Sequence, residues 1–183
     1  QEIRLYSDLK LVHQWERLMI VSGPPKNLIF AQNTWSDVQN AKVTSIGDAV
    51  KVLKKHGKLW TPYSHQLHRR MNLVQEQLPK MKSKPVEFGK GSFSTNLGAW
   101  TLEDANNLWF SANTSSPFPH GEVEFVEDKT APSRAYLKLW EFFTLHKARP
   151  QKSDICLDLG ACPGGWTWVL TDLCKKVISV DKA

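Results

Sequence analysis

The carboxyl-terminal part of the sequence contains a glycine-rich segment whose residue types could hold a nucleoside. The segment runs from Asp158 to Thr167 and reads DLGACPGGWT. Its glycines allow a tight turn from a strand into a helix and a close approach of the backbone to a ligand. Asp181 follows 23 residues after Asp158, and a carboxylate at the end of the next strand can accept hydrogen bonds from both hydroxyls of a ribose.

The spacing of the glycines separates this loop from two common phosphate-binding loops. It does not match Gly-x-Gly-x-x-Gly, which disfavours NAD and FAD, and it lacks Gly-Lys-Ser/Thr, which disfavours a P-loop NTPase. A nucleoside without a pyrophosphate fits better, and S-adenosylmethionine is the candidate ligand. The alternative interpretation is a structural glycine turn in an unrelated α/β protein.

Such a loop must be positioned by the elements on either side of it. The apolar runs Ile155–Leu159 and Val177–Val180 predict two short buried strands, and residues 165–175 between them predict a helix. Strand, loop, helix and strand form a βαβ unit, in which ligands bind at the carboxyl ends of the strands. A strong helix is expected before this unit, over Arg134–His146, because its large apolar residues recur at helical spacing.

Upstream of that helix, the sequence predicts a mixture of helices and strands. Ser45 can cap a helix that ends at Gly57, and an apolar stripe before Pro79 predicts another. Leu97–Leu102 and Leu108–Ala112 predict a β-hairpin. The remaining expectations are strands at Leu28–Ala31 and Gly121–Val126 and a polar loop over residues 80–91.

Composition is that of an ordinary globular protein. Of the 183 residues, 41% are hydrophobic and 23% are charged, which excludes collagen, long coiled coils and a wholly disordered chain. No run of 18 apolar residues predicts a transmembrane helix, and the amino terminus lacks the pattern of a signal peptide, so no membrane contact is expected. The three cysteines are too few, and odd in number, to indicate a disulfide framework, which is typical of a protein in the reducing cytoplasm. Neither the cysteines nor the six histidines have the spacing of a metal site, so no metal is expected.

The net charge of +6 comes from one block of the sequence. Residues 51–90 carry ten Lys and Arg against two Asp and Glu, a net of +8. Such a block favours phosphate contacts through counterion release, which makes RNA a candidate partner; the alternative is a solvated helical face. Trp60 and Tyr63 within the block could stack on unpaired bases, or Trp60 could be buried in a core. The candidate RNA-binding residues are Lys54, Lys55, Lys58, Arg69 and Arg70.

Two motifs resemble one known family. Leu157–Thr167, LDLGACPGGWT, resembles motif I of the FtsJ (RrmJ)-like ribose 2′-O-methyltransferases, and more closely the RlmM-type enzymes that methylate a cytidine ribose of bacterial 23S ribosomal RNA. Ala131–Leu139, APSRAYLKL, is similar to the helix that precedes motif I in that family. Ser115–Pro119 with Gly121 resembles the family's loop upstream of it. The match covers Asn106–Asp181.

The resemblance implies a Rossmann-like fold, S-adenosylmethionine as cofactor and ribosomal RNA as substrate. The family uses a Lys-Asp-Lys-Glu tetrad, whose first lysine maps onto Lys138. An electrostatic and positioning role is expected for Lys138, and the alternative is a solvated lysine on an amphipathic helix. The remaining tetrad members would lie on later strands, which the sequence to Ala183 does not include. The residues expected at the cofactor site are Ser133, Asp158, Gly160, Cys162, Pro163, Gly164, Gly165, Trp166 and Asp181.

Three of these side chains have a second interpretation. Asp158 is expected to sit at the strand end and order the loop rather than to act as a catalytic acid. Cys162 is expected to pack against the cofactor, and the alternative is a reactive thiol near a helix amino terminus. Trp166 is more typical of a packing residue than of a base-stacking platform.

We therefore expect an α/β chain with two parts. Residues 1–119 would form an α+β region that could bind RNA, and residues 120–183 the first part of a Rossmann-like methyltransferase domain. The expected function is methyl transfer to a ribose 2′-hydroxyl of 23S ribosomal RNA, and the alternative is a non-catalytic RNA-binding fragment or degenerate relative with part of the cofactor site. A two-stranded piece of a larger sheet has an exposed edge, so marginal stability is expected for it alone. The sequence does not indicate an oligomeric state.

Overall fold

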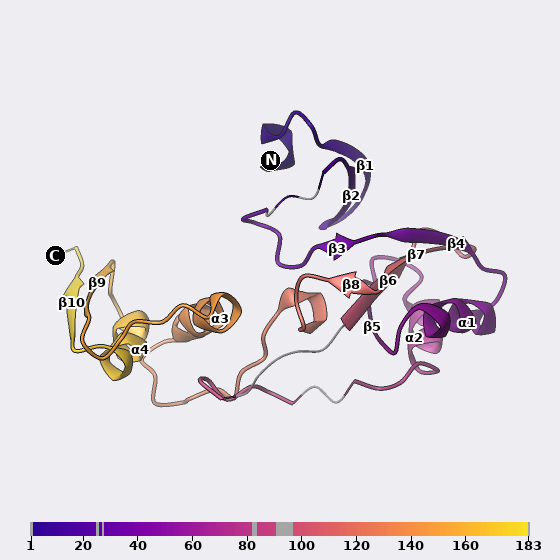
Figure 1. Cartoon of the computed structure of the whole chain (residues 1–183). Helices are drawn as coiled ribbons and strands as arrows, with labels where there is room; N and C mark the ends of the chain where they lie inside the picture. Colours follow the sequence, from indigo (N-terminus) through magenta and orange to yellow (C-terminus); the bar gives the residue numbers. More distant parts are fainter. Residues whose placement is uncertain (1, 25, 27, 82–83, 91–96, 183) are drawn as a thin grey trace. The chain divides into compact units, whose positions relative to one another are not determined.

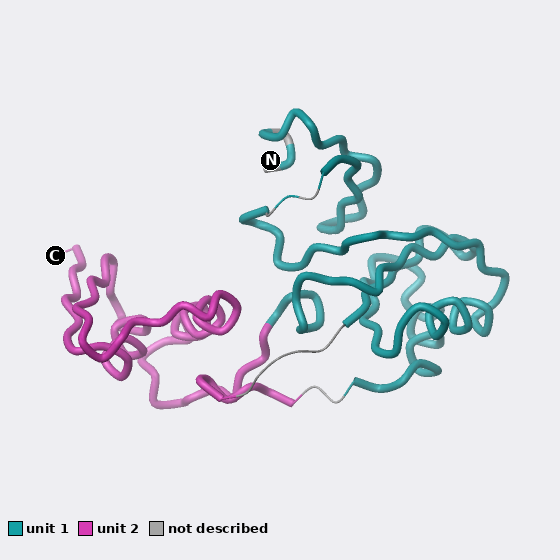
Figure 2. Tube along the Cα trace, in the orientation of Figure 1, with its two compact units in different colours: residues 1–83, 93–122 teal, residues 84–92, 123–183 magenta. Residues whose placement is uncertain are grey.

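The computed structural model describes the chain except for residues 1, 25, 27, 82–83, 91–96 and 183. The chain divides into two compact units (Figure 2). Unit 1 comprises residues 1–83 and 93–122, and unit 2 comprises residues 84–92 and 123–183. Unit 2 therefore includes a short segment that comes before the predicted β-hairpin in the sequence.

A four-stranded sheet lies at the centre of unit 1 (Figure 1). Its strand order is β4-β7-β6-β5, and the neighbouring strands are antiparallel except for β5 and β6, which are parallel. The helices and strands of unit 1 are η1 (Glu2–Leu5), β1 (Lys10–Trp15), β2 (Leu18–Ser22), β3 (Trp35–Ser36), β4 (Gln39–Lys42), α1 (Ile46–His56), β5 (Leu59–Pro62), α2 (His68–Gln75), β6 (Leu97–Leu102), β7 (Asn107–Ser111), β8 (Asn113–Thr114) and η2 (Pro119–Gly121).

Helix α1 begins and ends where its sequence predicts. The Ser45 hydroxyl accepts a hydrogen bond from the Asp48 N–H at 3.1 Å, and the Gly57 N–H donates to the Leu53 carbonyl at 3.0 Å. The first of these bonds satisfies a backbone donor that has no partner within the helix, and the second closes the last turn. Val50 and Leu53 are buried between the two ends, so one face of α1 joins the core.

The predicted hairpin is confirmed as β6 and β7, and β6 is buried along its whole length. Trp60 of β5 packs into the same core with 2% of its surface exposed, which confirms its interpretation as a core residue. Gly98 makes this packing possible, since a Cβ there would lie 2.5 Å from the indole of Trp60. The predicted apolar stripe before Pro79 also contributes buried residues, Met71, Val74 and Leu78.

Two predicted strands are wrong. Leu28–Ala31 forms a turn, and the side chains of Ile29 and Phe30 are 84% and 85% exposed, so the apolar run has no sheet face to bury. Gly121–Val126 is no continuous strand either. This segment makes one isolated parallel bridge, between Phe125 and Val86. Val86 lies in a loop and not in a strand, so the pairing does not extend beyond this bridge. Residues 82–83 and 91 of the expected loop at 80–91 lie outside the described residues.

Unit 2 contains the predicted βαβ unit and the helix before it. Its elements are α3 (Tyr136–His146), β9 (Ile155–Leu159), α4 (Gly165–Leu173) and β10 (Lys176–Val180). Strands β9 and β10 pair in parallel, with Asp158 opposite Ser179. One core of large side chains, including Tyr136, Trp140 and Val169, holds α3 against α4.

Only one face of the β9–β10 pair is covered in the described structure. On the other face, Ile155, Leu157 and Leu159 are 64%, 58% and 71% exposed, and Ile178 and Val180 are exposed beside them. The prediction of two buried strands is therefore wrong for this chain, although both strands form. Side chains alternate between the faces of a strand, and α4 packs against the face that carries Asp158.

Candidate cofactor site

The glycine-rich loop begins at the carboxyl end of β9 and crosses to the end of β10. The N–H groups of Gly160 and Ala161 donate to the Val180 carbonyl at 2.8 and 3.3 Å. Gly160 and Gly164 have φ values of 78° and 98°, in the left-handed region that a side chain disfavours. The two glycines therefore let the backbone leave β9, turn and enter α4 within a few residues.

The start of α4 lies directly against the start of α3. A Cβ on Gly165 would lie 2.5 Å from the Ser133 hydroxyl oxygen and 3.3 Å from the Tyr136 backbone nitrogen, so glycine suits this close approach. The indole N–H of Trp166 donates to the Ala135 carbonyl at 3.0 Å. Ala135 is the residue that precedes the first turn of α3. Ser133 thus packs against Gly165, and the hydrogen bond of Trp166 connects α4 to α3, the helix that carries Lys138.

These elements line a half-open cavity of about 220 Å³. It lies at the carboxyl end of β9, where a βαβ unit binds ligands. Most of the cofactor-site residues expected from the sequence meet there, together with Lys138. The residues that line the cavity are Ala135, Lys138, Asp158, Leu159, Gly160, Ala161, Cys162, Pro163, Gly165 and Trp166. Three expected residues do not line it: Ser133 and Asp181 contact the loop instead, and Gly164 forms the turn into α4.

Lys138 is exposed in the first turn of α3. Its neighbours on the helix, Tyr136 and Trp140, are buried in the core of unit 2, and the Tyr136 hydroxyl accepts a hydrogen bond from the Asp128 N–H at 2.7 Å. This anchoring orients α3 so that Lys138 lies on the side of the cavity. A positive charge at this position can stabilise negative charge that develops in the cavity.

Asp158 is 4% exposed, which is unusual for a carboxylate. Its Oδ2 atom accepts a hydrogen bond from the Thr167 hydroxyl at 2.6 Å. The Thr167 oxygen also lies 2.9 Å from the Ser179 hydroxyl, so the three side chains form a chain that joins β9, α4 and β10. The sequence pattern pointed to Asp158 but to neither partner. Thr167 lies inside the glycine-rich motif, while Ser179 carries no signal until the register of the two strands is known.

Asp181 closes the loop from the end of β10. Its Oδ2 atom accepts a hydrogen bond from the Cys162 N–H, and its Oδ1 atom accepts one from the Lys182 N–H. Each carboxylate oxygen has two lone pairs, so both can still accept hydrogen bonds from a ligand. Asp181 is exposed, which leaves it accessible.

The site fits part of a nucleoside sulfonium. Hydrogen-bond acceptors at Asp158 and Asp181 suit an amino group and ribose hydroxyls, and the loop places backbone beside open space, since a Cβ on Gly160 would meet nothing within 4 Å. The cavity of about 220 Å³ is smaller than the ~300–1,000 Å³ of sites that enclose a whole drug-sized ligand. The described residues can therefore enclose one portion of such a ligand.

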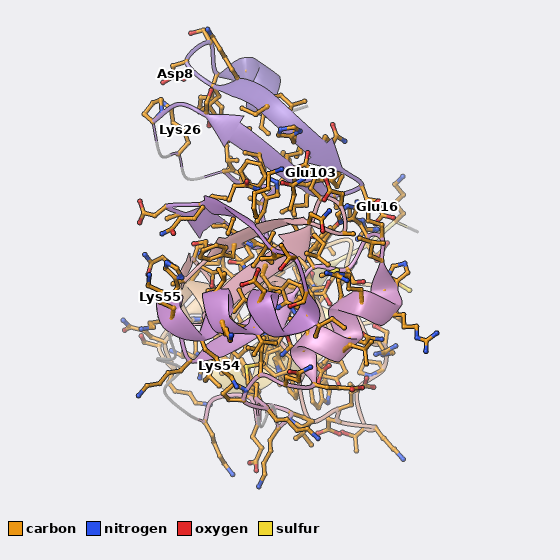
Figure 3. All side chains as sticks on the ribbon, turned by 90° about the vertical axis from the view of Figure 1, so that its right-hand side faces the viewer. Asp8, Glu16, Lys26, Lys54, Lys55 and Glu103 are labelled. Atoms are coloured by element: carbon orange, nitrogen blue, oxygen red, sulfur yellow. The ribbon has the colours of Figure 1, made fainter. Side chains whose placement is uncertain are left out.

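The five candidate RNA-binding residues lie in unit 1. Lys54 and Lys55 are exposed in the last turn of α1 (Figure 3), and Lys58 is exposed between α1 and β5. Arg69 and Arg70 lie in the first turn of α2, which packs against α1; Arg69 is exposed and Arg70 is half-buried. Most of these cations are therefore accessible to a phosphate.

The two aromatic residues within the basic block have structural contacts. Trp60 is buried in the core of unit 1, so it is not available for stacking on a base. Tyr63 is half-buried, and its hydroxyl accepts a hydrogen bond from the Arg17 N–H at 3.1 Å. The accessible part of the block is therefore cationic rather than aromatic.

Two findings concern other kinds of chemistry in the described part of the chain. There, no group of three His, Cys, Asp or Glu side chains is placed to hold a metal ion. No helix in the described residues is long and apolar enough to cross a membrane.

Comparison with known proteins points to one family. Residues 131–183 match the model of the FtsJ-like methyltransferase family. The chain is 30% identical over 199 aligned residues to "Ribosomal RNA large subunit methyltransferase M" of Xylella fastidiosa (strain 9a5c), an alignment that covers 100% of this chain and 49% of the relative. The protein of the same name from Shewanella sediminis (strain HAW-EB3) is 39% identical over 159 residues, with 78% of this chain and 44% of the relative covered. The chain spans about half the length of the curated relatives it matches, and the resemblance expected from the two motifs is confirmed.

Proposed function

Since this chain resembles the FtsJ-like methyltransferases and the large-subunit ribosomal RNA methyltransferases named above, we propose that it is part of an RNA methyltransferase. The reaction proposed is transfer of a methyl group from S-adenosylmethionine to a ribose 2′-hydroxyl, with 23S ribosomal RNA as substrate. The observation that carries this proposal is the meeting of Lys138, Asp158 and the glycine-rich loop around one cavity at the carboxyl end of β9. A Rossmann-like sheet, of which β9 and β10 would be two strands, is the fold proposed for residues 120–183.

The residues of this chain divide into those that hold the cofactor and one that acts on the substrate. When bound, S-adenosylmethionine supplies a methyl group on a positively charged sulfur. The loop backbone from Gly160 to Gly165 would let the ligand approach, and Asp158 would accept hydrogen bonds from it at the cavity wall. Asp181, which holds the loop through the Cys162 N–H, would accept hydrogen bonds from the ribose. Lys138 stabilises the negative charge that develops on the attacking 2′-oxygen and helps to orient it.

RNA contact is proposed for the exposed cations at the end of α1, in the turn after it and at the start of α2. These four cations are Lys54, Lys55, Lys58 and Arg69. Because α1 packs beside α2, cations from both helices are available to the phosphates of an RNA. Such contacts release counterions and make binding depend on salt concentration. The partner proposed is RNA, without membrane contact, and the cytoplasm is the proposed location because Cys156, Cys162 and Cys174 are all free thiols.

Isothermal titration of S-adenosylmethionine and S-adenosylhomocysteine into the 183-residue chain tests the cofactor site. Micromolar binding by the unsubstituted chain, weakened about 10- to 100-fold in Asp181→Ala, is the expected result. No measurable heat with either ligand would contradict a formed cofactor site in this chain. The same titration on a longer protein that contains the chain then separates a site completed by further strands from a site that does not exist.

A second function, RNA binding without catalysis, is favoured by the size of the cavity. At about 220 Å³ the cavity encloses only part of the expected ligand, as a degenerate or partial site would. The discriminating measurement is methyl incorporation into 23S ribosomal RNA by the longer protein. Incorporation into a ribose establishes the enzyme, whereas tight RNA binding with no incorporation supports the non-catalytic alternative.

A further inference from the structure

The hydroxyl of Thr167 sits between two other side chains that belong to different strands. It donates to Asp158 Oδ2 at 2.6 Å and lies 2.9 Å from the Ser179 hydroxyl. Asp158 and Ser179 are direct neighbours in the parallel pairing of β9 and β10, so their side chains project from the same face toward α4. Thr167 comes from the first turn of α4 and meets both of them.

Thr167 does not belong to the cavity itself. Asp158 lines the cavity, whereas neither Thr167 nor Ser179 does. Thr167 is half-buried, and Asp158 is 4% exposed, so the hydrogen bond between them is largely shielded from water. A shielded hydrogen bond to a carboxylate restricts its rotation and replaces part of the hydration that burial removes.

We propose that Thr167 is a positioning residue: its hydrogen bond fixes the orientation of the Asp158 carboxylate, so that this carboxylate can accept hydrogen bonds from a ligand in the cofactor cavity. The proposal rests on the proposed function, because it assigns Asp158 to the cofactor. Ser179 completes the arrangement as the second contact of the Thr167 hydroxyl, which leaves that hydroxyl one preferred direction for its proton: toward Asp158 Oδ2. Thr167 thus acts on the ligand through Asp158 and not by contact.

The chain offers variants that separate the hydroxyl from the rest of the side chain. Thr167→Val keeps a branched side chain of similar size and removes the donor, while Thr167→Ser keeps the donor. Thr171→Val is the matched control, because Thr171 lies one turn later on α4 and its hydroxyl donates only locally, to the Thr167 carbonyl at 2.8 Å. None of these changes alters charge.

Affinity for S-adenosylmethionine, measured by isothermal titration, is the first readout. Thr167→Val should bind about 10- to 100-fold more weakly, as expected when a hydrogen bond to a charged group is removed. Thr167→Ser should stay within about threefold of the unsubstituted chain, and Thr171→Val within about twofold. Equal weakening by Thr167→Ser and Thr167→Val would overturn the proposal, because the methyl group rather than the hydroxyl would then matter.

A double-variant cycle tests whether the effect passes through Asp158. In an Asp158→Ala chain, Thr167→Val should change the affinity by less than about twofold, since the carboxylate it positions is gone. The same fold-change in both backgrounds would overturn the proposal.

The cycle also has a readout that needs no ligand. If the unsubstituted chain takes up no S-adenosylmethionine, the cofactor site is not formed in this chain alone, and the same four chains are compared by urea unfolding. Non-additive effects of Thr167→Val and Asp158→Ala on the free energy of unfolding support the positioning contact, and additive effects overturn it.

Discussion

The Asp181 carboxylate accepts a hydrogen bond from the backbone N–H of Cys162, although the two residues are 19 positions apart. The residue expected to hold a ribose therefore also holds the glycine-rich loop in place. Asp181 follows the end of β10 and Cys162 lies in the loop after β9, so the contact joins that loop to the end of the neighbouring strand. If Asp181 also holds the ribose, as proposed, loop order and ligand binding depend on the same side chain.

This coupling predicts different outcomes for two substitutions of Asp181. Asp181→Ala removes both the charge and the acceptor for the Cys162 N–H, so binding of S-adenosylmethionine should fall by about 10- to 100-fold and amide hydrogen exchange should become faster across residues 160–164. Asp181→Asn keeps an acceptor, so exchange should stay near that of the unsubstituted chain while affinity still falls. Exchange in Asp181→Asn as fast as in Asp181→Ala would contradict this division of roles.

Lys138 should affect turnover and not cofactor binding. In a longer protein that contains this chain, Lys138→Ala should reduce methyl transfer to ribosomal RNA by roughly 100-fold or more, the size expected when a group that stabilises developing charge is removed. Its affinity for S-adenosylmethionine should be retained within about threefold, because Lys138 is assigned to the substrate oxygen and comes from α3 rather than from the glycine-rich loop. Undiminished turnover would exclude the role assigned to Lys138 and favour a solvated lysine.

A side chain at Gly165 should reduce the stability of the chain. Gly165→Ala places a Cβ 2.5 Å from the Ser133 hydroxyl oxygen and 3.3 Å from Ala135 Cβ, so we expect stability in urea unfolding to fall by about 1–3 kcal/mol. Gly47→Ala is the matched control. The nearest atom to a Cβ at Gly47, the Ser45 hydroxyl oxygen, is 4.0 Å away, and alanine at this helical position should stabilise the chain by up to about 1 kcal/mol. Equal effects of the two substitutions would mean that α3 and α4 are not packed as closely as the structure indicates.

His65 should make the stability of the chain depend on pH. Burial lowers the pKa of His65 below its usual value of 6.5, the Glu16 carboxylate opposes the shift, and His68 adds to it. The His65 ring stacks on Trp15 of β1, which pairs with β2 in an antiparallel hairpin, at a centroid distance of 5.5 Å. The His65 Nε2 atom is buried without a hydrogen-bond partner in the described structure.

The sign of this effect follows from which state binds more protons. The folded pKa is depressed, so near pH 6 the unfolded chain binds more protons than the folded chain, and stability falls as the pH falls through and below 6.5. Urea unfolding at about pH 7.5 and about pH 5.5 measures the difference. His65→Phe keeps a ring for the stack and should flatten the difference, whereas His146→Gln, at an exposed position at the end of α3, should leave it unchanged. An undiminished pH dependence in His65→Phe would assign it to another group.

The exposed Lys54 and Lys55 at the end of α1 should contribute to the salt dependence of RNA binding. For single-stranded RNA, removal of each phosphate contact should reduce the slope of log affinity against log salt by about 0.7. Lys54→Ala with Lys55→Ala should therefore weaken binding to any RNA and flatten the slope by about 1.4 in filter binding. Lys129→Ala, at an exposed position of unit 2 outside the basic block, serves as the control. An unchanged slope in the double variant would remove these two lysines from the RNA interface.

Much of the local structure is determined by the sequence alone. Ser45 and Gly57 mark the ends of α1, because the capping hydrogen bonds join atoms only three or four residues apart. The apolar spacing of residues 134–146 is also a local signal, and it predicts α3. The βαβ unit follows from two apolar runs separated by glycines whose positive φ values a strand-to-helix turn requires. The motif at Leu157–Thr167 also contains most of the residues that line the cavity.

Tertiary structure decided which side chains meet and which segments are buried. Ile29 and Phe30 form an apolar run but lie in a turn, because strand formation depends on pairing with distant segments that a local pattern does not encode. Asp158, Thr167 and Ser179 come together because β9 and β10 pair in a register that places Asp158 opposite Ser179, and α4 lies over that face. The sequence names the residues that can carry the chemistry, and long-range pairing and packing determine the partners that orient them.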